Sequence, residues 1–490
     1  MKLKIELDRQ SETPLHRQLY DKMTGLILSG ALEPGTRIPA SRTLAADLGV
    51  SRPTVNACLD QLVQEGYIET KPNSGSFISS NLTTESLKRS LPKGAKTKSS
   101  SIAEYELSTY GKYISRKPEV TESEKEPDIS FYCWRPALDQ FPIAEWARVL
   151  GKHARTSSPS ELDADWDPQG RLDLREALAK LVKRFRQVSC HPDQIFPVMG
   201  LNQGIDLVSR LHLDEGSGVV VEEPGFRPAA FEACGAQLLP VPVDGDGLNV
   251  ARLPQKKGRE SVDLAYLTPA RQFPTGAVMP LARRLEFLNW ASASGTLVLE
   301  DDYDSEYQYS GQPIPALMSL DREQRVIYLG TLNQIMFPSL GFAYLIVPPR
   351  MVPLYRKARQ LAGAQFSPQF QSAVAEFISK GHLDRHVKRL RALYRARRDT
   401  LIQALEKRFK SSVTIGPNRH GVFLSVTFDI GLDDDEIIER ARRAGVGLTS
   451  AREFYSRKKP NQQVIMGFGS LSEREIEKGV QKLATALLST

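Results

Sequence analysis

Apolar positions at helical spacing mark three short helices in the first eighty residues. The stretch from Leu15 carries apolar side chains three and four positions apart and stops at Gly30, which predicts an amphipathic helix. A second helix is predicted from Ser41, a suitable N-cap, to Gly49, a suitable C-terminal stop. A third follows at once, with Ser51 as its N-cap and a proline in its first turn. Its predicted buried stripe comprises Val55, Leu59, Leu62 and Val63.

The residues after the third helix change to a strand-like pattern. The stretch YIETKPNSGSFIS gives two short strands around a Pro-Asn-Ser-Gly turn. Three helices followed by such a hairpin have the outline of a winged helix-turn-helix, which we assign to residues 1–80.

The pattern changes twice more along the chain. Residues 81–127 are rich in Ser, Thr and Lys and poor in large apolar residues, which predicts a flexible linker. From Asp128 to Thr490, helical patterns alternate with short apolar strands such as SGVVVEEP, VDLAYLTP and GTLVLEDDY. That alternation predicts an α/β domain with a mainly parallel sheet flanked by helices, with a smaller α+β subdomain completing it.

Composition narrows the class of protein. The net charge is +7, yet residues 1–80 hold equal numbers of basic and acidic residues, so charge does not identify a nucleic-acid surface. The densest basic run, from His382 to Arg398, has helical spacing and is interpreted as the solvated face of a long helix. The four cysteines have no metal-ligand spacing and are expected to be core thiols; no metal site is predicted. Because no apolar signal core or membrane span is recognisable, we expect a cytoplasmic protein.

The third helix carries the candidate DNA contacts. Its N-terminus leaves Arg52, Thr54 and Asn56 outward, and a helix end in the major groove places such side chains against base edges and phosphates. The alternative is a three-helix domain whose polar face is only solvated. The segment PLHRQLYDKMTG to PNSGSF, with its blocks PGTRIPASRTLA and GVSRPTV, resembles the GntR-family DNA-binding domain. This resemblance implies binding to double-stranded operator DNA, with candidate contacts at Arg42, Ser51, Arg52, Thr54, Asn56, Lys71, Ser74 and Gly75.

Two motifs in residues 128–490 suggest a phosphate-cofactor pocket. The strand-turn-helix PVMGLNQGIDL would present the backbone N–H groups of Gly200, Leu201 and Asn202 at a helix N-terminus. In LEDDYDSEY, Asp301 can face a pyridine nitrogen and Tyr303 a phenolic oxygen. Taken alone, the second motif is better interpreted as an acidic loop after a buried strand.

The order of motifs is more specific than any one of them. Blocks from FYCWRPALDQFP to MGFGSLSEREIEKGV, nearly the whole chain outside the linker, resemble MocR-type regulators, the GntR subfamily with a fold-type I aminotransferase-like domain. The resemblance implies an aminotransferase-like domain, normally a binder of pyridoxal phosphate, that forms a homodimer with the pocket at the subunit interface.

Four positions depart from the family pattern. The Schiff-base lysine position holds Gln334, whose amide nitrogen is not nucleophilic. The arginine that resembling proteins aim at the cofactor phosphate is replaced by Gly341, and the arginine that grips a substrate carboxylate aligns with Ile465. The usual histidine of one further block is Arg271, which either returns a positive charge to the pocket or points outward.

These losses predict that the domain has no aminotransferase activity. Losing a charge-assisted phosphate contact alone costs ~1.5–3 kcal/mol. What remains is compatible with weak, non-covalent binding of pyridoxal phosphate or with an empty pocket. The pocket remnants are Gly200, Leu201, Asn202, Asp301, Tyr303, Thr331 and Gln334.

The sequence suggests three alternative functional interpretations. The first is a DNA-binding regulator whose C-terminal domain dimerises and senses a small effector. The second is a constitutive DNA-binding protein with a C-terminal scaffold, and the sequence leaves the choice between these two open. The third, a pyridoxal-phosphate-dependent aminotransferase with an accessory DNA-binding domain, conflicts with Gln334.

Overall fold

The computed structural model comprises two units, and the boundary between them lies between residues 106 and 107. It describes residues 5–72, 74–81, 106–116, 127–163, 167–255, 261–309, 314–363, 366–417, 419–456 and 462–488.

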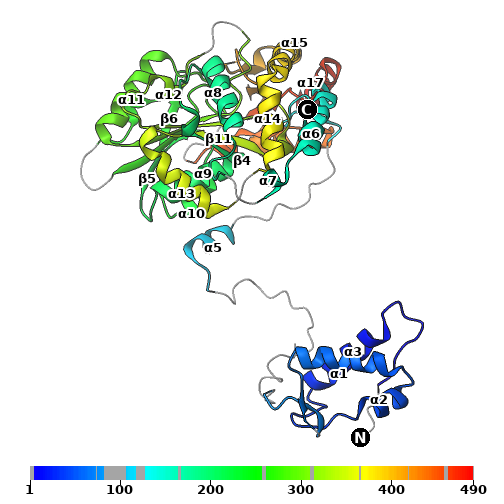
Figure 1. Ribbon diagram of the computed structural model, residues 1–490. Coiled ribbons are helices and arrows are strands. Elements are labelled where there is room, and N and C mark those ends of the chain that lie inside the picture. The colour runs from blue at the N-terminus through cyan, green and yellow to red at the C-terminus, as the bar shows by residue number, and fades with distance from the viewer. Residues whose placement is uncertain are drawn as a thin grey trace. The chain divides into compact units, whose positions relative to one another are not determined.

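The first unit is the predicted winged helix-turn-helix (Figure 1). Gly49 ends the second helix in the left-handed conformation at φ +65°, and the Ser51 side chain caps the third. The two strands of the wing pair antiparallel, with Ile68 opposite Ile78 and Lys71 opposite Gly75. The elements are α1 Leu15–Leu28, α2 Ser41–Leu48, α3 Arg52–Gln64, β1 Ile68–Lys71 and β2 Gly75–Ile78.

The buried stripe of α3 differs from the predicted one. Val55 and Leu62 are fully buried as expected, whereas Leu59 is only partly buried and Val63 is 40% exposed. Cys58, which the predicted stripe did not include, is fully buried. Val63 lies eight residues after Val55, which turns it about 80° away from that side chain, so the helix presents it at the edge of the core.

The second unit is built on an eight-stranded sheet in the order β4-β11-β10-β9-β8-β5-β6-β7. Strands β10, β9, β8, β5 and β6 pair in parallel, while β11 is antiparallel to both of its neighbours and β7 returns antiparallel to β6. The prediction of a mainly parallel sheet is confirmed. The strands are β4 Ile195–Met199, β5 Gly218–Glu223, β6 Gln237–Asp244, β7 Gly247–Leu248, β8 Val262–Leu267, β9 Leu297–Asp302, β10 Val326–Thr331 and β11 Phe342–Ile346.

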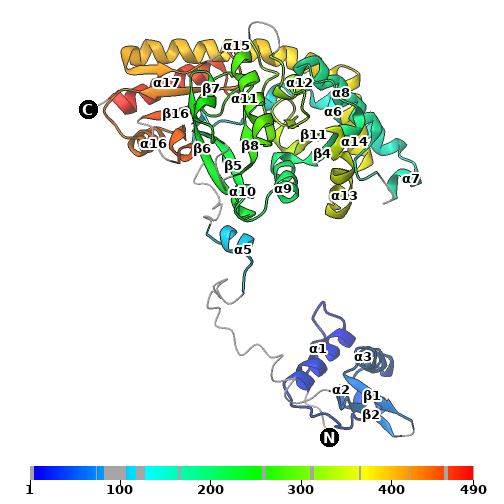
Figure 2. The same cartoon turned by 90° about the vertical axis from the view of Figure 1, so that its left-hand side faces the viewer.

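Alternate residues of each strand bury into different layers, as the two-residue period of a strand requires. In β9, Leu297 and Leu299 face one hydrophobic cluster and Val298 faces another. Helices α9, α10 and α13 cover the first face, and α8, α11 and α14 lie on the opposite one (Figures 1 and 2). The covering helices are α6 Ile143–Thr156, α7 Pro159–Leu162, α8 Leu172–Arg186, α9 Gly200–His212, α10 Ala229–Ala233, α11 Leu281–Ser294, α12 Leu317–Leu320, α13 Val352–Ala362 and α14 Pro368–Ser379.

A smaller α+β part completes the second unit, also as predicted. Its four-stranded sheet has the order β12-β13-β16-β15 and packs with α15, α16 and α17. The short parallel pair of β3 and β14 connects this α+β part to residues near the start of the second unit. The elements are β3 Ile129–Ser130, α15 His382–Phe409, β12 Val413–Ile415, β13 Phe423–Phe428, α16 Asp434–Arg443, β14 Val446–Gly447, β15 Thr449–Ser450, β16 Gln463–Gly467 and α17 Glu473–Leu488.

One helix lies within the residues predicted as linker. Helix α5, Thr109–Ile114, is capped by Ser108 and contacts α10, where the Tyr113 hydroxyl donates to Glu232 Oε2 at 2.8 Å. Residues 107–116 therefore belong structurally to the second unit. Much of the rest of 81–127 lies outside the described residues.

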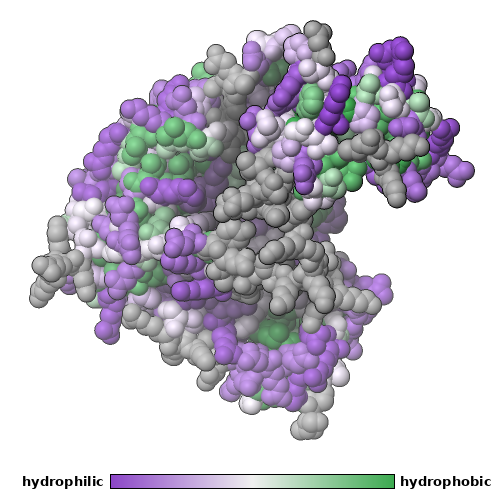
Figure 3. Space-filling model, turned by 90° about the horizontal axis from the view of Figure 1, so that it is seen from below, coloured by the Kyte–Doolittle hydropathy of each residue, from purple (hydrophilic) through white to green (hydrophobic). Residues whose placement is uncertain are grey.

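One face of the molecule shows how polar and apolar residues are distributed on the surface. The face in Figure 3 is dominated by hydrophilic residues, with hydrophobic ones in smaller patches. Among the described helices, none combines the length and apolarity that crossing a membrane requires.

Candidate functional site

The N-terminus of α3 presents polar side chains on a fixed helix end. Ser51 Oγ accepts from the Thr54 backbone N–H at 3.3 Å and lies 2.7 Å from the Thr54 hydroxyl. These bonds hold the first turn in place, and Arg52 and Asn56 are exposed beside it. The helix end can therefore offer two free polar side chains and a partly positive dipole to a phosphate or a base edge.

The wing adds a second polar edge to this surface. Gly75 has φ +104°, a conformation that L side chains rarely adopt, and a Cβ placed there would lie 3.4 Å from Arg37 Nε. The Lys71 ammonium lies 5.2 Å from the centre of the Phe77 ring. Arg37 was missed by the sequence analysis, because only the fold brings the segment before α2 alongside β2.

All but one of the predicted DNA contacts are exposed to solvent. A hollow of about 660 Å³ between α2, α3 and the wing is lined by Arg37, Asn56 and Gly75 among others. Thr54 is half-buried, and its hydroxyl is engaged with Ser51. The exposed members are Arg42, Ser51, Arg52, Asn56, Lys71, Ser74 and Gly75.

The second candidate site lies in the other unit, at the carboxyl ends of the parallel strands. Asp301 follows the parity of Leu297 and Leu299, so its side chain turns to the face that α9 covers, and Asp302 turns to the other face. Asp301 Oδ2 accepts from the Tyr266 hydroxyl at 2.5 Å. Its Oδ1 is buried and has no hydrogen-bond partner among the described residues. Burial raises the pKa of Asp301 to about 7.

A second buried carboxyl group accompanies Asp301. Glu222, near the end of β5, accepts from the Thr268 backbone N–H and hydroxyl and from the Gln272 amide. Burial raises the pKa of Glu222 to about 7. The sequence analysis missed Glu222, although its place at the end of a buried parallel strand was a usable signal.

The predicted phosphate-binding turn is formed at the N-terminus of α9. Gly200 begins the helix with φ +81°, and a Cβ added to it would lie 3.9 Å from the Gly341 carbonyl oxygen. A Cβ added to Gly341 would meet nothing within 4 Å, so there is space where the resembling proteins carry arginine. Within the first turns of α9, Gln203 Oε1 accepts from the Met199 backbone N–H and from Arg359 Nη1. Arg359 is a buried cation that the sequence analysis missed, because it comes from α13.

Gln334 lies three residues after the end of β10 and is enclosed by protein. Its side chain is 7% exposed, and its Oε1 has no partner among the described residues. Its backbone carbonyl accepts from the Tyr307 hydroxyl at 2.8 Å. Thr331, at the end of β10, donates its hydroxyl to the Phe342 carbonyl at 3.0 Å.

An apolar cluster occupies the space between the large sheet and the small one. Trp134 lies 4.9 Å from both the Phe273 and the Tyr303 ring centres, and Phe423 and Ile465 are fully buried against the same group. The Tyr303 hydroxyl donates to the Arg271 carbonyl at 2.8 Å. Ile465 therefore lies among aromatic rings. Its side chain provides no cation to pair with a substrate carboxylate.

Arg271 does not point outward, which was one of the two orientations expected for it. It is 2% exposed, and its Nη1 forms an ion pair with Asp304 Oδ2 at 2.8 Å. Its Nη2 donates to the Phe423 carbonyl, and its guanidinium carbon lies 3.6 Å from the centre of the Phe423 ring. The charge of Arg271 is thus neutralised at the boundary between the two sheets.

Comparison with known proteins yields two family matches. Residues 15–78 match the family of bacterial regulatory proteins of the gntR type, and residues 140–483 match the family of class I and II aminotransferases.

Individual relatives match along nearly the full chain. The probable rhizopine catabolism regulatory protein MocR of Rhizobium meliloti is 33% identical over 99% of this chain and 96% of its own. The pyridoxine biosynthesis transcriptional regulator PdxR of Corynebacterium glutamicum is 28% identical over 99% and 98%. Among solved structures, the α-aminoadipate aminotransferase LysN of Thermus thermophilus matches with a TM-score of 0.67 and 27% identity, covering 74% of this chain and 92% of its own.

Proposed function

The chain belongs to the gntR family of bacterial regulatory proteins, in the group that carries a class I and II aminotransferase domain, and from this premise we propose a division of labour between its two units. The protein is a DNA-binding transcription regulator. The first unit reads the operator through α3 and the wing. The second dimerises the protein and performs no amino-group transfer.

The observation that carries the DNA-binding part is the capped N-terminus of α3 with Arg52 exposed beside it. An arginine at this place is suited to pair bidentately with guanine or to bind a phosphate. The wing carries Lys71 and the glycine turn. It is suited to contact the DNA phosphate backbone beside the groove that α3 enters.

Arg52→Ala tests this assignment on duplexes recovered from a random pool by the full chain. We expect a loss of ~1–3 kcal/mol if Arg52 reads a base. A phosphate contact would instead weaken all sequences alike and reduce the salt slope by about one. Arg17→Ala, on the exposed outer side of α1, is the matched control. Equal binding by Arg52→Ala and the parent at several salt concentrations would contradict the assignment.

The proposed lack of catalysis rests on Gln334. Its amide cannot attack an aldehyde, and it provides no base to move a substrate proton. The apolar surroundings of Ile465 and the ion pair between Arg271 and Asp304 also leave the substrate side without a cation at either of these positions.

The residues of the pocket fit pyridoxal phosphate only in part. The unpaired Asp301 Oδ1 is an acceptor for a ring nitrogen, and the N-terminus of α9 offers N–H groups to a phosphate. Position 341 offers no cation, and position 334 offers no amine. When bound in this fold, the cofactor supplies an electron sink, and here we propose that it binds weakly and without a covalent bond.

Absorbance titration with pyridoxal phosphate, followed by borohydride trapping and peptide mapping, tests this proposal. The parent should give no trapped lysine in the pocket and no transfer between amino and keto acids. Gln334→Lys alone should restore little activity, because Gly341 and Ile465 remain. Stoichiometric trapping at a pocket lysine of the parent, together with turnover, would overturn it.

A further inference from the structure

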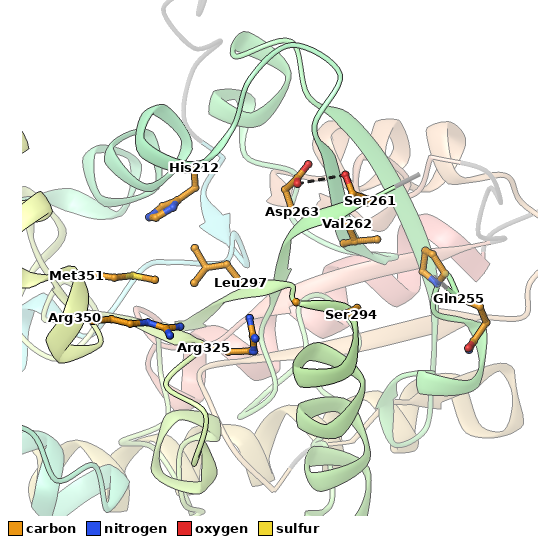
Figure 4. A pocket seen from close by; sticks show the side chains of 12 residues that line it. His212, Gln255, Ser261, Val262, Asp263, Ser294, Leu297, Arg325, Arg350 and Met351 are labelled. Carbon is orange, nitrogen blue, oxygen red and sulfur yellow. Dashed lines mark hydrogen bonds between the residues drawn. The ribbon is translucent and has the colours of Figure 1, made fainter. Parts of the chain in front are cut away.

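A cavity of about 370 Å³ lies at the amino-terminal edge of the large sheet, away from the pocket described above (Figure 4). Val262 and Leu297, the first residues of β8 and β9, line it, and Asp301 lies at the far end of β9. Four residue steps along β9, about 13 Å, therefore separate the two places. The C-terminal end of α9, at His212, reaches the cavity, whereas the N-terminus of that helix lies at the other pocket.

Two arginines face this cavity. Arg350 follows β11 in a short 3-10 turn, and Arg325 immediately precedes β10; in Figure 4 the Arg350 side chain extends toward Arg325. Arg350 Nη2 donates to the Gln324 carbonyl at 3.0 Å. The Arg325 Nε–H is buried and has no acceptor among the described residues.

The acidic groups nearby are occupied by other donors. Asp263 Oδ2 accepts from the Gly218 backbone N–H at 3.1 Å, and its Oδ1 accepts from the Ser261 hydroxyl at 3.5 Å. Asp321 accepts from the backbone N–H groups of Arg325 and Val326. Within the described part of the chain, neither arginine of the cavity forms an ion pair with a carboxylate.

A structural explanation for the arginines would be the neutralisation of helix C-termini. Helix α11 ends at the cavity, but the Ser294 hydroxyl and the Gly295 and Thr296 N–H groups already bond its last carbonyls. The carbonyl that Arg350 bonds belongs to the Asp321–Arg325 loop and not to a helix. The end of α11 and the carbonyl that Arg350 bonds therefore do not explain both guanidinium groups as helix C-terminal partners.

We propose that this cavity binds a small organic oxyanion, with the carboxylate or phosphate group between Arg325 and Arg350. A guanidinium group is the side chain best matched to such groups, because its parallel N–H donors fit two oxygens at once. The remainder of the ligand lies against Leu297, Val262 and Met351, and the volume suits a molecule of metabolite size.

Calorimetric titration of the full chain tests the proposal with four probes: inorganic phosphate, ribose 5-phosphate, succinate and neutral ribose. At least one anion should bind saturably, and ribose should not. Arg325→Gln and Arg350→Gln should each weaken that binding at least tenfold. Arg322→Gln, an exposed arginine of the same loop, should leave it within twofold. The preferred probe decides between a phosphate and a carboxylate ligand.

A second measurement does not depend on the variants folding. Phenylglyoxal modification of the parent, read by peptide mass spectrometry, should label Arg325 and Arg350 more slowly when the bound anion is present, with no change at Arg322. Anion binding that persists in both variants belongs elsewhere, the N-terminus of α9 included, and would overturn the proposal. Labelling unaffected by the anion, or no saturable binding at all, would overturn it too.

Discussion

The neighbouring carboxyl groups of Asp301 and Asp302 in β9 have different partners because they point to opposite faces of the sheet. Asp302 pairs with Arg186 at 2.5 Å and accepts from the Tyr328 hydroxyl at 2.6 Å, so its charge is held inside the protein. Among the described residues, Asp301 has the Tyr266 hydroxyl as its one side-chain hydrogen-bond partner and keeps one oxygen without a partner. Asp301 was chosen for the pocket from the sequence because of its place in the motif LEDDYDSEY and the family resemblance. The ion pair of Asp302 with Arg186 was not predictable, because it joins segments far apart in the chain.

Asp301→Asn should change how stability depends on pH. In the unfolded chain this carboxyl group releases its proton near pH 4, whereas in the folded protein burial raises its pKa to about 7. Between these values the folded state binds more protons, so its free energy of unfolding falls as the pH rises from about 4 to about 7. Over this pH window, the free energy of unfolding of Asp301→Asn should fall less than that of the parent, by about 1–4 kcal/mol.

Urea unfolding across pH 4–8 measures this difference. All four tryptophans lie in residues 128–490, so their fluorescence reports the second unit. Asp246→Asn, whose side chain is 62% exposed, is the control and should follow the parent. Parallel curves for Asp301→Asn and the parent would show that Asp301 is ionised in the folded protein.

Restoring an arginine at position 465 should destabilise the protein. Ile465 is fully buried among Phe273, Tyr303 and Phe423, and an unpaired guanidinium there costs about 3–5 kcal/mol. Ile465→Val, the control, should cost only about 0.5–1.5 kcal/mol. Urea midpoints by tryptophan fluorescence give both values. An Ile465→Arg protein as stable as the control would mean that the cluster opens to solvent.

At the level of elements, local signals predicted more than long-range ones. The stop at Gly49 located the end of α2 and the cap at Ser51 located the start of α3, because both act on adjacent residues. The predicted cap of α2 was wrong, since Ser41 is the first residue of the helix and Ala40 occupies the N-cap position.

The place of Arg271 depends on Asp304 and on Phe423, which is about 150 positions away in sequence, and no local pattern carries that information. Helix α5 was missed for a related reason, since it has no buried residue to give it periodicity and is held by a contact to α10.

Ser51→Ala should loosen the start of α3. The substitution removes the acceptor for the Thr54 N–H and the bond to the Thr54 hydroxyl, and lost N-caps cost ~1 kcal/mol. Hydrogen exchange of peptides from residues 50–66 should be faster at the first turn, and the affinity for selected DNA should fall. Ser11→Ala, in an exposed loop, should change neither. Unchanged exchange at Thr54 would show that the cap is not needed for the helix to form.

At the level of the whole molecule, we expect a homodimer held together by the second unit. Aminotransferase-like folds of this type place the pocket at a subunit interface, and a two-fold axis would bring a second α3 to a bipartite operator. Sedimentation at micromolar concentration should give twice the chain mass of 54.6 kDa. A single-chain mass at that concentration would contradict the prediction.

In the expected homodimer, the contact of α5 with α10 would also limit the spacing of the DNA sequences that the two first units can reach together. From Ser79 to Leu107 the chain has about 28 residues, which reach ~100 Å at most when fully extended. A chain held only from Asp128 onward would have a ceiling of ~170 Å. While α5 stays bound, operators with widely separated half-sites are out of range. If the chain dimerises as expected, the hydrogen bond of Tyr113 to Glu232 would thus help to set which promoter architectures it can bridge.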